Sequence, residues 1–136
     1  MLNRYTLAED DAQATDGLLL PEGHYIDLPG RGRCFYREIP NPGKPSLVLL
    51  HGMFCSALTN WYRCFHHLAP HFHIIAPDLR GHGRSFHNSR SFRLRSCAKD
   101  ISALLNALDV HDAILVGYSM GGAVVQHVMQ IGRAHV

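Results

Sequence analysis

Three short apolar runs in the chain predict strands that are buried on both faces. They lie at 47–50, 74–76 and 113–116, and each consists of Leu, Ile, Val or Ala without an alternating polar position. An uninterrupted apolar strand is typical of a parallel sheet with helices packed against both of its faces. The chain therefore predicts a largely parallel sheet at the centre of the fold.

The segments that follow these strands predict helices. Between 92 and 108, apolar residues recur at the spacing of one buried helix face, namely Leu94, Ala98, Ile101, Leu104, Leu105 and Leu108. Further helices are expected around 58–68 and at 122–129. Buried strands that alternate with helices indicate the α/β class.

Ahead of the first buried strand, the chain predicts an antiparallel hairpin. Two strand-like segments, 25–28 and 34–39, are joined by the Gly-Arg-Gly-Arg sequence at 30–33, which suits a tight connection. Residues 1–20 mix acidic, amide and small residues without a sustained period, so we expect a loose leader there. The expected organisation is this leader followed by a single domain segment at 21–130.

The overall composition is that of an ordinary globular chain. Of 136 residues, 46% are hydrophobic and 18% are charged, and the formal net charge is +2. Six basic residues lie between Arg80 and Lys99 without the interleaved aromatic platform of an RNA-binding surface, so we assign them to a solvated face. No apolar stretch is long enough to cross or target a membrane. We expect a small-molecule substrate, with neither nucleic acid nor membrane as partner, and the composition predicts no particular oligomeric state.

The cysteines and histidines predict neither a disulfide framework nor a metal site. The four cysteines show no C-x-x-C spacing, which fits reduced thiols in a cytoplasmic protein. The densest histidine group, His66, His67, His71 and His73, straddles Pro70 and a predicted change from helix to strand, and no H-E-x-x-H pattern accompanies it. We expect no metal and no other cofactor.

The strongest chemical signal is the segment Gly117-Tyr118-Ser119-Met120-Gly121, which lies between a predicted strand and a predicted helix. A G-x-S-x-G sequence in this context is typical of a nucleophile elbow, a tight turn that presents the serine hydroxyl at the carboxyl end of a sheet. Gly117 and Gly121 fit for a steric reason, since a side chain at either position would collide within the turn. Ser119 is therefore the candidate nucleophile, and the N–H of Met120 is placed to stabilise an oxyanion.

Two more motifs precede the elbow, each at the end of a predicted strand. His51-Gly52-Met53 follows the first buried strand, and Asp-Leu-Arg-Gly-His-Gly-Arg-Ser at 78–85 follows the second. With these motifs in this order, the chain resembles the N-terminal half of the α/β-hydrolase superfamily over roughly residues 24–129. The resemblance implies an α/β-hydrolase fold fragment, with a mostly parallel sheet flanked by helices and an antiparallel hairpin at its N-terminal side.

The resemblance also implies roles for individual residues. In relatives, the residue after His-Gly supplies a backbone N–H to the oxyanion hole, so Met53 and Met120 are the two expected donors. His51 and Gly52 shape that loop. Asp78 begins a loop that is usually architectural, in which its carboxylate can bond nearby backbone N–H groups, so it is not expected to be catalytic.

Serine at the elbow narrows the expected chemistry. Haloalkane dehalogenases and epoxide hydrolases of this fold carry Asp there, because they form an alkyl-enzyme ester. Ser119 points instead to attack on an ester, lactone, thioester or similar activated carbonyl, through an acyl-enzyme that water then hydrolyses. The expected function is that of an esterase-like serine hydrolase. The alternatives are a non-catalytic binding protein of the same fold and an acyltransferase or haloperoxidase-like relative.

The rest of a catalytic triad is missing from the chain. A serine nucleophile needs a base and a group that orients the base, and relatives carry these after the serine, as Asp or Glu and then His. No Asp or Glu follows Ser119, His127 lies about 12 Å further along the same predicted helix, and His135 has no carboxylate to orient it. His51 as a substitute base has no evident partner to hold its tautomer. We therefore expect an N-terminal half that is inactive alone, with its acid and base on further sequence.

Two further expectations concern the last part of the chain. The strand at 113–116 lies in the middle of the sheet in relatives, so without its next neighbour we expect it to be an exposed apolar edge and an aggregation liability. Residues 131–136 resemble the in-frame translation of a widely used DNA sequencing adapter, and we expect them to be a non-native tail.

Overall fold

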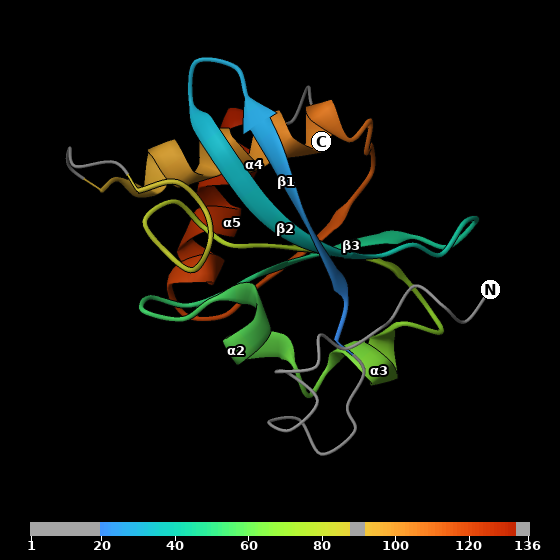
Figure 1. Ribbon diagram of the computed structural model, residues 1–136. Helices are drawn as coiled ribbons and strands as arrows, with labels where there is room; N and C mark the ends of the chain where they lie inside the picture. The colour runs from blue at the N-terminus through green and yellow to red at the C-terminus, as the bar shows by residue number, and fades with distance from the viewer. Residues whose placement is uncertain (1–19, 88–91, 133–136) are drawn as a thin grey trace.

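A five-stranded sheet with helices on both faces forms the described part of the chain, residues 20–87 and 92–132 of the computed structural model (Figure 1). On one face lie α4 (Leu94–Ala107) and α5 (Met120–Ile131), and on the other lie α2 (Ala57–Trp61) and α3 (Phe65–Leu68). The expected α/β class is confirmed. Residues 1–19 of the expected leader and 133–136 of the expected tail lie outside the described residues.

The sheet is mixed, with four of its five strands running in one direction. Its strands, in the order β1-β2-β4-β3-β5, are β1 (Glu22–Leu28), β2 (Gly32–Ile39), β4 (His73–Pro77), β3 (Ser46–Leu50) and β5 (Ile114–Gly117). The hairpin partners β1 and β2 are antiparallel, β2 is antiparallel to β4, and β4, β3 and β5 are parallel neighbours. Both the N-terminal hairpin and the mostly parallel sheet agree with the expectation from the sequence.

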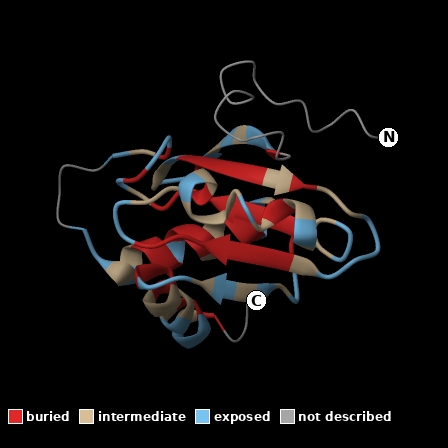
Figure 2. Cartoon of the chain, turned by 90° about the horizontal axis from the view of Figure 1, so that it is seen from below, coloured by how far each residue is buried: buried red, intermediate tan, exposed pale blue. Residues whose placement is uncertain are grey.

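The two central strands are apolar at successive positions because their two faces belong to two different cores. In β3, Val48 and Leu50 pack into the core shared with α4 and α5, whereas Leu47 and Leu49 pack into the core shared with α2 and α3. Figure 2 shows these central strands buried along almost their whole length. The double burial explains the unbroken apolar runs from which the strands were predicted.

Strand β5 forms one edge of the sheet within the described residues. Leu115 packs partly against the core under α4 and α5, but Ile114 and Val116, on the opposite face, are 45% and 38% exposed. The strand is accordingly tan and pale blue in Figure 2. The apolar edge expected from the sequence is therefore present in the described structure.

The prediction of a single helix around 58–68 is wrong, since the segment forms two short helices, α2 and α3. The break lies where the N–H of Cys64 bonds the carbonyl of Trp61, three residues back, in place of a bond four residues back. Asn, Trp, Tyr and Cys crowd this stretch, and none of them is a strong helix former. The turn allows both Ala57 and Phe65 to be fully buried against the sheet.

Candidate active site

Ser119 occupies the tight turn between β5 and α5. Its backbone has φ 52° and ψ −115°, so it belongs to the left-handed side of conformational space that side-chain-bearing residues rarely adopt. The residue is exposed, and its hydroxyl makes no hydrogen bond among the described residues. The backbone strain therefore presents a free serine hydroxyl at the carboxyl end of a parallel strand, as in a nucleophile elbow.

The two flanking glycines leave no room for a side chain. A Cβ on Gly117 would overlap the backbone of Gly121, and a Cβ on Gly121 would overlap the carbonyl of Leu50 and lie 2.7 Å from that of His51. The obstacles are backbone atoms, which cannot swing away as a flexible side chain can. Gly117 and Gly121 thus allow the first turn of α5 to lie directly against β5 and the end of β3.

The loop that follows β3 lies beside the elbow. β3 and β5 are parallel neighbours with Leu50 opposite Gly117, and the N–H of Tyr118 donates to the Leu50 carbonyl at 3.0 Å. Gly52 lies so close to the Tyr118 ring that a Cβ on it would be 2.9 Å from the ring's Cδ1. Met53, in the loop after β3, and Met120, the first residue of α5, therefore come from adjacent segments, and neither backbone N–H has a hydrogen-bond acceptor among the described residues.

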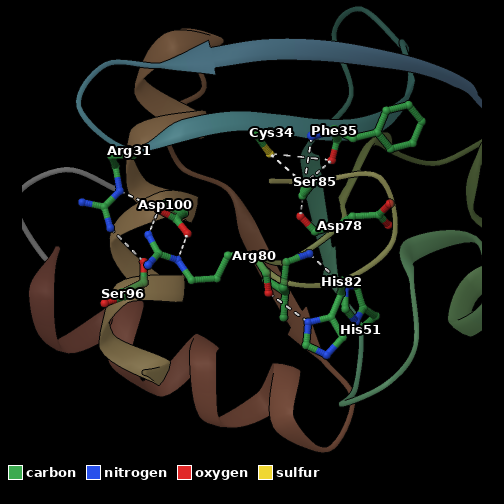
Figure 3. A network of polar contacts seen from close by, with 11 residues as sticks. Arg31, Cys34, Phe35, His51, Asp78, Arg80, His82, Ser85, Ser96 and Asp100 are labelled. Carbon is green, nitrogen blue, oxygen red and sulfur yellow. Dashed lines mark hydrogen bonds and ion pairs between the residues drawn. The ribbon is translucent and has the colours of Figure 1, made fainter. Parts of the chain in front are cut away.

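His51 is fully buried, and both of its ring nitrogens are engaged (Figure 3). Nδ1 lies 2.7 Å from the Gly52 carbonyl, to which it can only donate, while Nε2 accepts the N–H of Leu79 at 2.9 Å. This pattern requires the neutral ring, and burial lowers the pKa of His51 below its ordinary value. His51 therefore ties the β3 loop to the β4 loop and has no free nitrogen with which to accept a proton from Ser119.

Asp78 uses both carboxylate oxygens to hold backbone groups. Oδ1 accepts the N–H of Ala57, the first residue of α2, at 2.8 Å, and Oδ2 accepts the N–H of Arg84 at 2.9 Å. The hydroxyl of Ser85 closes the same loop by donating to the Asp78 carbonyl at 2.6 Å while accepting the N–H of Phe35 at 2.9 Å. These bonds make the 78–85 loop a brace between α2, β2 and β4, so Asp78 serves the architecture of the site.

A buried ion cluster behind this loop was not anticipated from the sequence. Asp100 on α4 receives Nε and Nη2 of Arg80 at 2.6 and 2.8 Å, and Nε of Arg31 at 2.5 Å (Figure 3). The bonds to Asp100 raise the pKa of Arg80 above its usual value. The expectation of a solvated basic face is therefore wrong for Arg80, whose side chain is only 10% exposed. The expectation of a solvated face holds for the other basic residues of this segment that the structure describes, all of which are exposed, namely Arg84, Arg93, Arg95 and Lys99.

No complete acid–base pair for Ser119 lies within the described residues. His127 is partly exposed on α5, and no Asp or Glu follows Ser119 in the chain. His135 lies outside the described residues. Among 20–87 and 92–132, no group of three or more His, Cys, Asp or Glu is arranged to hold a metal ion, and no helix combines the length and apolar character needed to cross a bilayer.

Comparison with known proteins places this geometry in a family. Residues 45–136 match the family model described as the alpha/beta hydrolase fold. The chain is 42% identical over 132 residues to the dihydrolipoyllysine-residue acetyltransferase component of the acetoin cleaving system of Pseudomonas putida. That alignment covers 96% of this chain and 34% of the Pseudomonas putida protein. It is also 38% identical over 93 residues to a non-heme chloroperoxidase of Streptomyces lividans, and this alignment covers 67% of this chain and 33% of the chloroperoxidase.

Solved structures show the same relationship. A haloalkane dehalogenase variant from Bradyrhizobium elkanii superposes with a TM-score of 0.76 and 30% identity, over 85% of this chain and 37% of that one. A hydrolase from Pseudomonas aeruginosa superposes with a TM-score of 0.76 and 26% identity, over 84% of this chain and 42% of that one. The chain thus spans between 23% and 37% of the length of the curated relatives it matches. With the elbow, the neighbouring loop and the family match in agreement, the chain belongs to the alpha/beta hydrolase fold family.

Proposed function

We propose that the native protein is a serine hydrolase that cleaves an ester, lactone, thioester or similar activated carbonyl through an acyl-enzyme on Ser119. The observation that carries the proposal is the strained, exposed Ser119 between β5 and α5, with φ 52° and a hydroxyl that has no hydrogen-bond partner among the described residues. Relatives with hydrolase in their names, such as the hydrolase YugF of Bacillus subtilis at 37% identity over 92 residues, support the reaction class.

The chemistry follows from the groups around the elbow. The Oγ of Ser119 attacks the carbonyl carbon and loses its proton to a base, and the carbonyl oxygen becomes an oxyanion. The backbone N–H groups of Met53 and Met120 stabilise that charge, and removal of one such donor typically costs about 10²–10³ in turnover. The leaving group departs with a proton, and water then hydrolyses the acyl-enzyme to regenerate Ser119.

The base and its orienting acid belong, in this proposal, to sequence beyond the present chain. His51 is unsuitable because its Nδ1 and Nε2 are both committed to backbone groups. His127 lies on α5, about 12 Å along the helix axis from Ser119, which immediately precedes the helix. The chain's coverage of only 23% to 37% of its relatives' length supports a longer native protein, in which 21–130 is the N-terminal half of an α/β-hydrolase domain.

Serine at the elbow argues against the chemistry named for some of the similar structures. Haloalkane dehalogenases and epoxide hydrolases of this fold use Asp to form an alkyl-enzyme ester, whereas Ser119 cannot supply a carboxylate. A second candidate, an acyltransferase or haloperoxidase-like enzyme on the same serine, is favoured by the similarity to the non-heme chloroperoxidase.

The free thiols of all four cysteines support a cytoplasmic location.

Covalent labelling with a fluorophosphonate probe tests the proposal. We expect the complete native protein to be labelled at Ser119, and Ser119→Ala to abolish labelling while retaining the fold. Ser102→Ala is the matched control, because the Ser102 hydroxyl is buried on α4 without a hydrogen-bond partner among the described residues and its loss should leave labelling unchanged.

The outcomes separate the alternatives. A folded, complete protein that takes no label would reject the enzyme proposal in favour of a non-catalytic binding protein. If labelling occurs, product analysis with an added alcohol distinguishes a hydrolase from an acyltransferase, because a transferase forms a new ester whereas a hydrolase releases the free acid.

A further inference from the structure

A pocket of about 520 Å³ opens between the loop after β3 and the loop after β4. Its apolar lining comes from Met53, Phe54 and Phe92, and Ser119 does not line it. Met53 nevertheless connects the pocket to the elbow, because the same residue belongs to the loop that lies beside Tyr118 and Ser119. A substrate with its carbonyl at the elbow can therefore extend part of its body into this pocket.

His82 supplies a fixed polar group to the wall of this pocket. The residue is only 9% exposed, and its ring lies 5.2 Å from the His51 ring and 5.7 Å, edge to face, from that of Phe92. Nδ1 lies 2.9 Å from the carbonyl of Arg80, to which it can only donate (Figure 3). In the neutral ring, this bond places the proton on Nδ1 and leaves Nε2 as an acceptor.

The Nε2 of His82 is the unbonded ring nitrogen of a residue that lines the pocket. This nitrogen has no hydrogen-bond partner among the described residues, but it is still accessible from outside. The described side-chain atoms that are both fully enclosed and unpartnered are others, namely Trp61 Nε1, His66 Nδ1 and Ser102 Oγ. The pocket that His82 lines is thus the direction from which a donor can reach it. A mostly buried acceptor without a partner favours a ligand that brings a hydrogen-bond donor.

The backbone that orients His82 is itself anchored. Arg80, whose carbonyl accepts the Nδ1 proton, is held through its side chain by the two carboxylate oxygens of Asp100. Asp100 is 5% exposed and lies on α4, so the anchor is part of the core and not of a surface loop. The His82 ring is therefore held in one orientation before a ligand binds, so little binding free energy is lost in ordering this side chain.

We propose that His82 determines substrate specificity by accepting, at Nε2, a hydrogen bond from a hydroxyl or amide N–H on a small, otherwise apolar substrate group in this pocket. The proposal rests on the function proposed for Ser119. It assigns to the site a preference for esters whose acyl or alcohol part carries such a donor over the same esters without it. The other polar lining residues, Cys55 and His87, are more exposed than His82, and their side chains make no hydrogen bond within the part of the chain that the structure describes.

The test uses the complete native protein and pairs of methyl butanoate esters that differ by one hydroxyl, at C2, C3 or C4 of the acyl chain. One net hydrogen bond corresponds to about a tenfold change in an equilibrium constant. We expect at least one hydroxylated ester to be preferred about tenfold in kcat/KM, mainly through a lower KM. His82→Phe, which keeps an aromatic ring but removes the acceptor, should bring that ratio close to unity.

His111→Gln is the matched histidine control, because the His111 side chain is 68% exposed and its ion-pair partner, Asp109, is exposed too. It should keep the preference of the unchanged protein. A preference that survives His82→Phe, or the absence of any preference among the pairs, would overturn the proposal. Labelling of Ser119 by the fluorophosphonate in those same samples would show that the proposed function stands even if His82 has no such role.

A second measurement decides the matter if His82→Phe does not fold or if Ser119 takes no label. The ¹⁵N chemical shift of His82 Nε2 in the otherwise unchanged protein, titrated with each ester pair, reports directly on a hydrogen bond to that atom. A shift with a hydroxylated ester and not with its partner supports the proposal. Equal responses to both members, or no response to either, reject it.

Discussion

The carbonyl oxygen of Leu50 occupies the space that a Cβ atom on Gly121 would need. Leu50 ends β3, and Gly121 lies in the first turn of α5, so the contact joins two segments that are far apart in the chain. The same carbonyl accepts the N–H of Tyr118 at 3.0 Å. The elbow is thus held against β3 by backbone atoms, and its geometry depends on the absence of a side chain at one position.

Gly121→Ala is therefore expected to destabilise the protein strongly, by about 3 kcal/mol or more, because backbone atoms must move to make room. Gly122→Ala is a matched control one residue away, since the nearest atom to its Cβ would be the Gly117 carbonyl oxygen at 3.5 Å. In a helix, that second change should stabilise by about 0.5–1 kcal/mol. Denaturant unfolding of the two variants measures the difference, and equal effects would contradict the steric explanation.

The buried His51 predicts a loss of stability in mild acid. Burial lowers the pKa of His51 below its ordinary value of 6.5, so the unfolded chain binds the proton more readily than the folded protein does. The free energy of unfolding should therefore be fully retained above that ordinary value and should fall as the pH drops below it. A protonated Nε2 would also face the N–H of Leu79, from which it now accepts.

His51→Gln tests this prediction, because an amide can both donate and accept but does not titrate in this range. Thermal unfolding measured between pH about 7 and pH about 5 should show a shallower decline for this variant than for the unchanged protein. Equal slopes would mean that the acid sensitivity comes from other groups.

The ion cluster predicts an unequal cost for two aspartate substitutions. Asp100→Ala leaves Arg80, with a side chain only 10% exposed, without its carboxylate, and loss of one partner of a buried pair typically costs about 3–5 kcal/mol. Asp27→Ala removes the 3.7 Å partner of Arg33, where the aspartate side chain is 86% exposed, so about 1 kcal/mol or less is expected. Unfolding free energies of similar size in the two variants would show that the buried cluster does not contribute in this way.

Cysteine reactivity should divide the four thiols into two classes. Burial raises the pKa of Cys34 to about 11 and that of Cys97 to about 12, so both stay protonated and enclosed at neutral pH. Cys55 and Cys64 are partly exposed. Iodoacetamide should therefore modify Cys55 and Cys64 first in the native protein, as followed by peptide mass spectrometry, whereas all four should react after unfolding. Modification of Cys97 as fast as Cys55 in the native state would contradict this.

Several structural elements were predictable from local patterns. The apolar runs at 47–50, 74–76 and 113–116 lie within β3, β4 and β5, except that Ala113 precedes β5 by one residue. The periodic segment that includes Leu94 and Leu105 forms α4. These predictions succeeded because a strand or helix between two layers must bury a regular set of positions, and that regularity is visible in the order of residues.

The features that the sequence analysis predicted wrongly or missed have a common cause. Weak helix formers permit a break between α2 and α3, but its place suits the burial of Ala57 and Phe65 against the sheet, which lies elsewhere in the sequence. The burial of Arg80 follows from the position of Asp100 on another element. His82 was visible in the 78–85 loop, but nothing in that loop indicates that one ring nitrogen is bonded and the other open. Such features depend on partners distant in sequence, so a local pattern contains no signal for them.

The sequence by itself determined the class of fold, the order of the strands along the chain, the helices α4 and α5, and the identity of the serine at the elbow, because periodicity and a short motif encode these locally. Only the tertiary structure decided which groups are available for chemistry. It commits both nitrogens of His51 to backbone partners, directs the carboxylate of Asp78 to Ala57 and Arg84, and leaves the hydroxyl of Ser119 unbonded among the described residues. The reason is that hydrogen-bonding capacity is a property of a residue, whereas its use is settled by the neighbours that folding brings within about 3 Å.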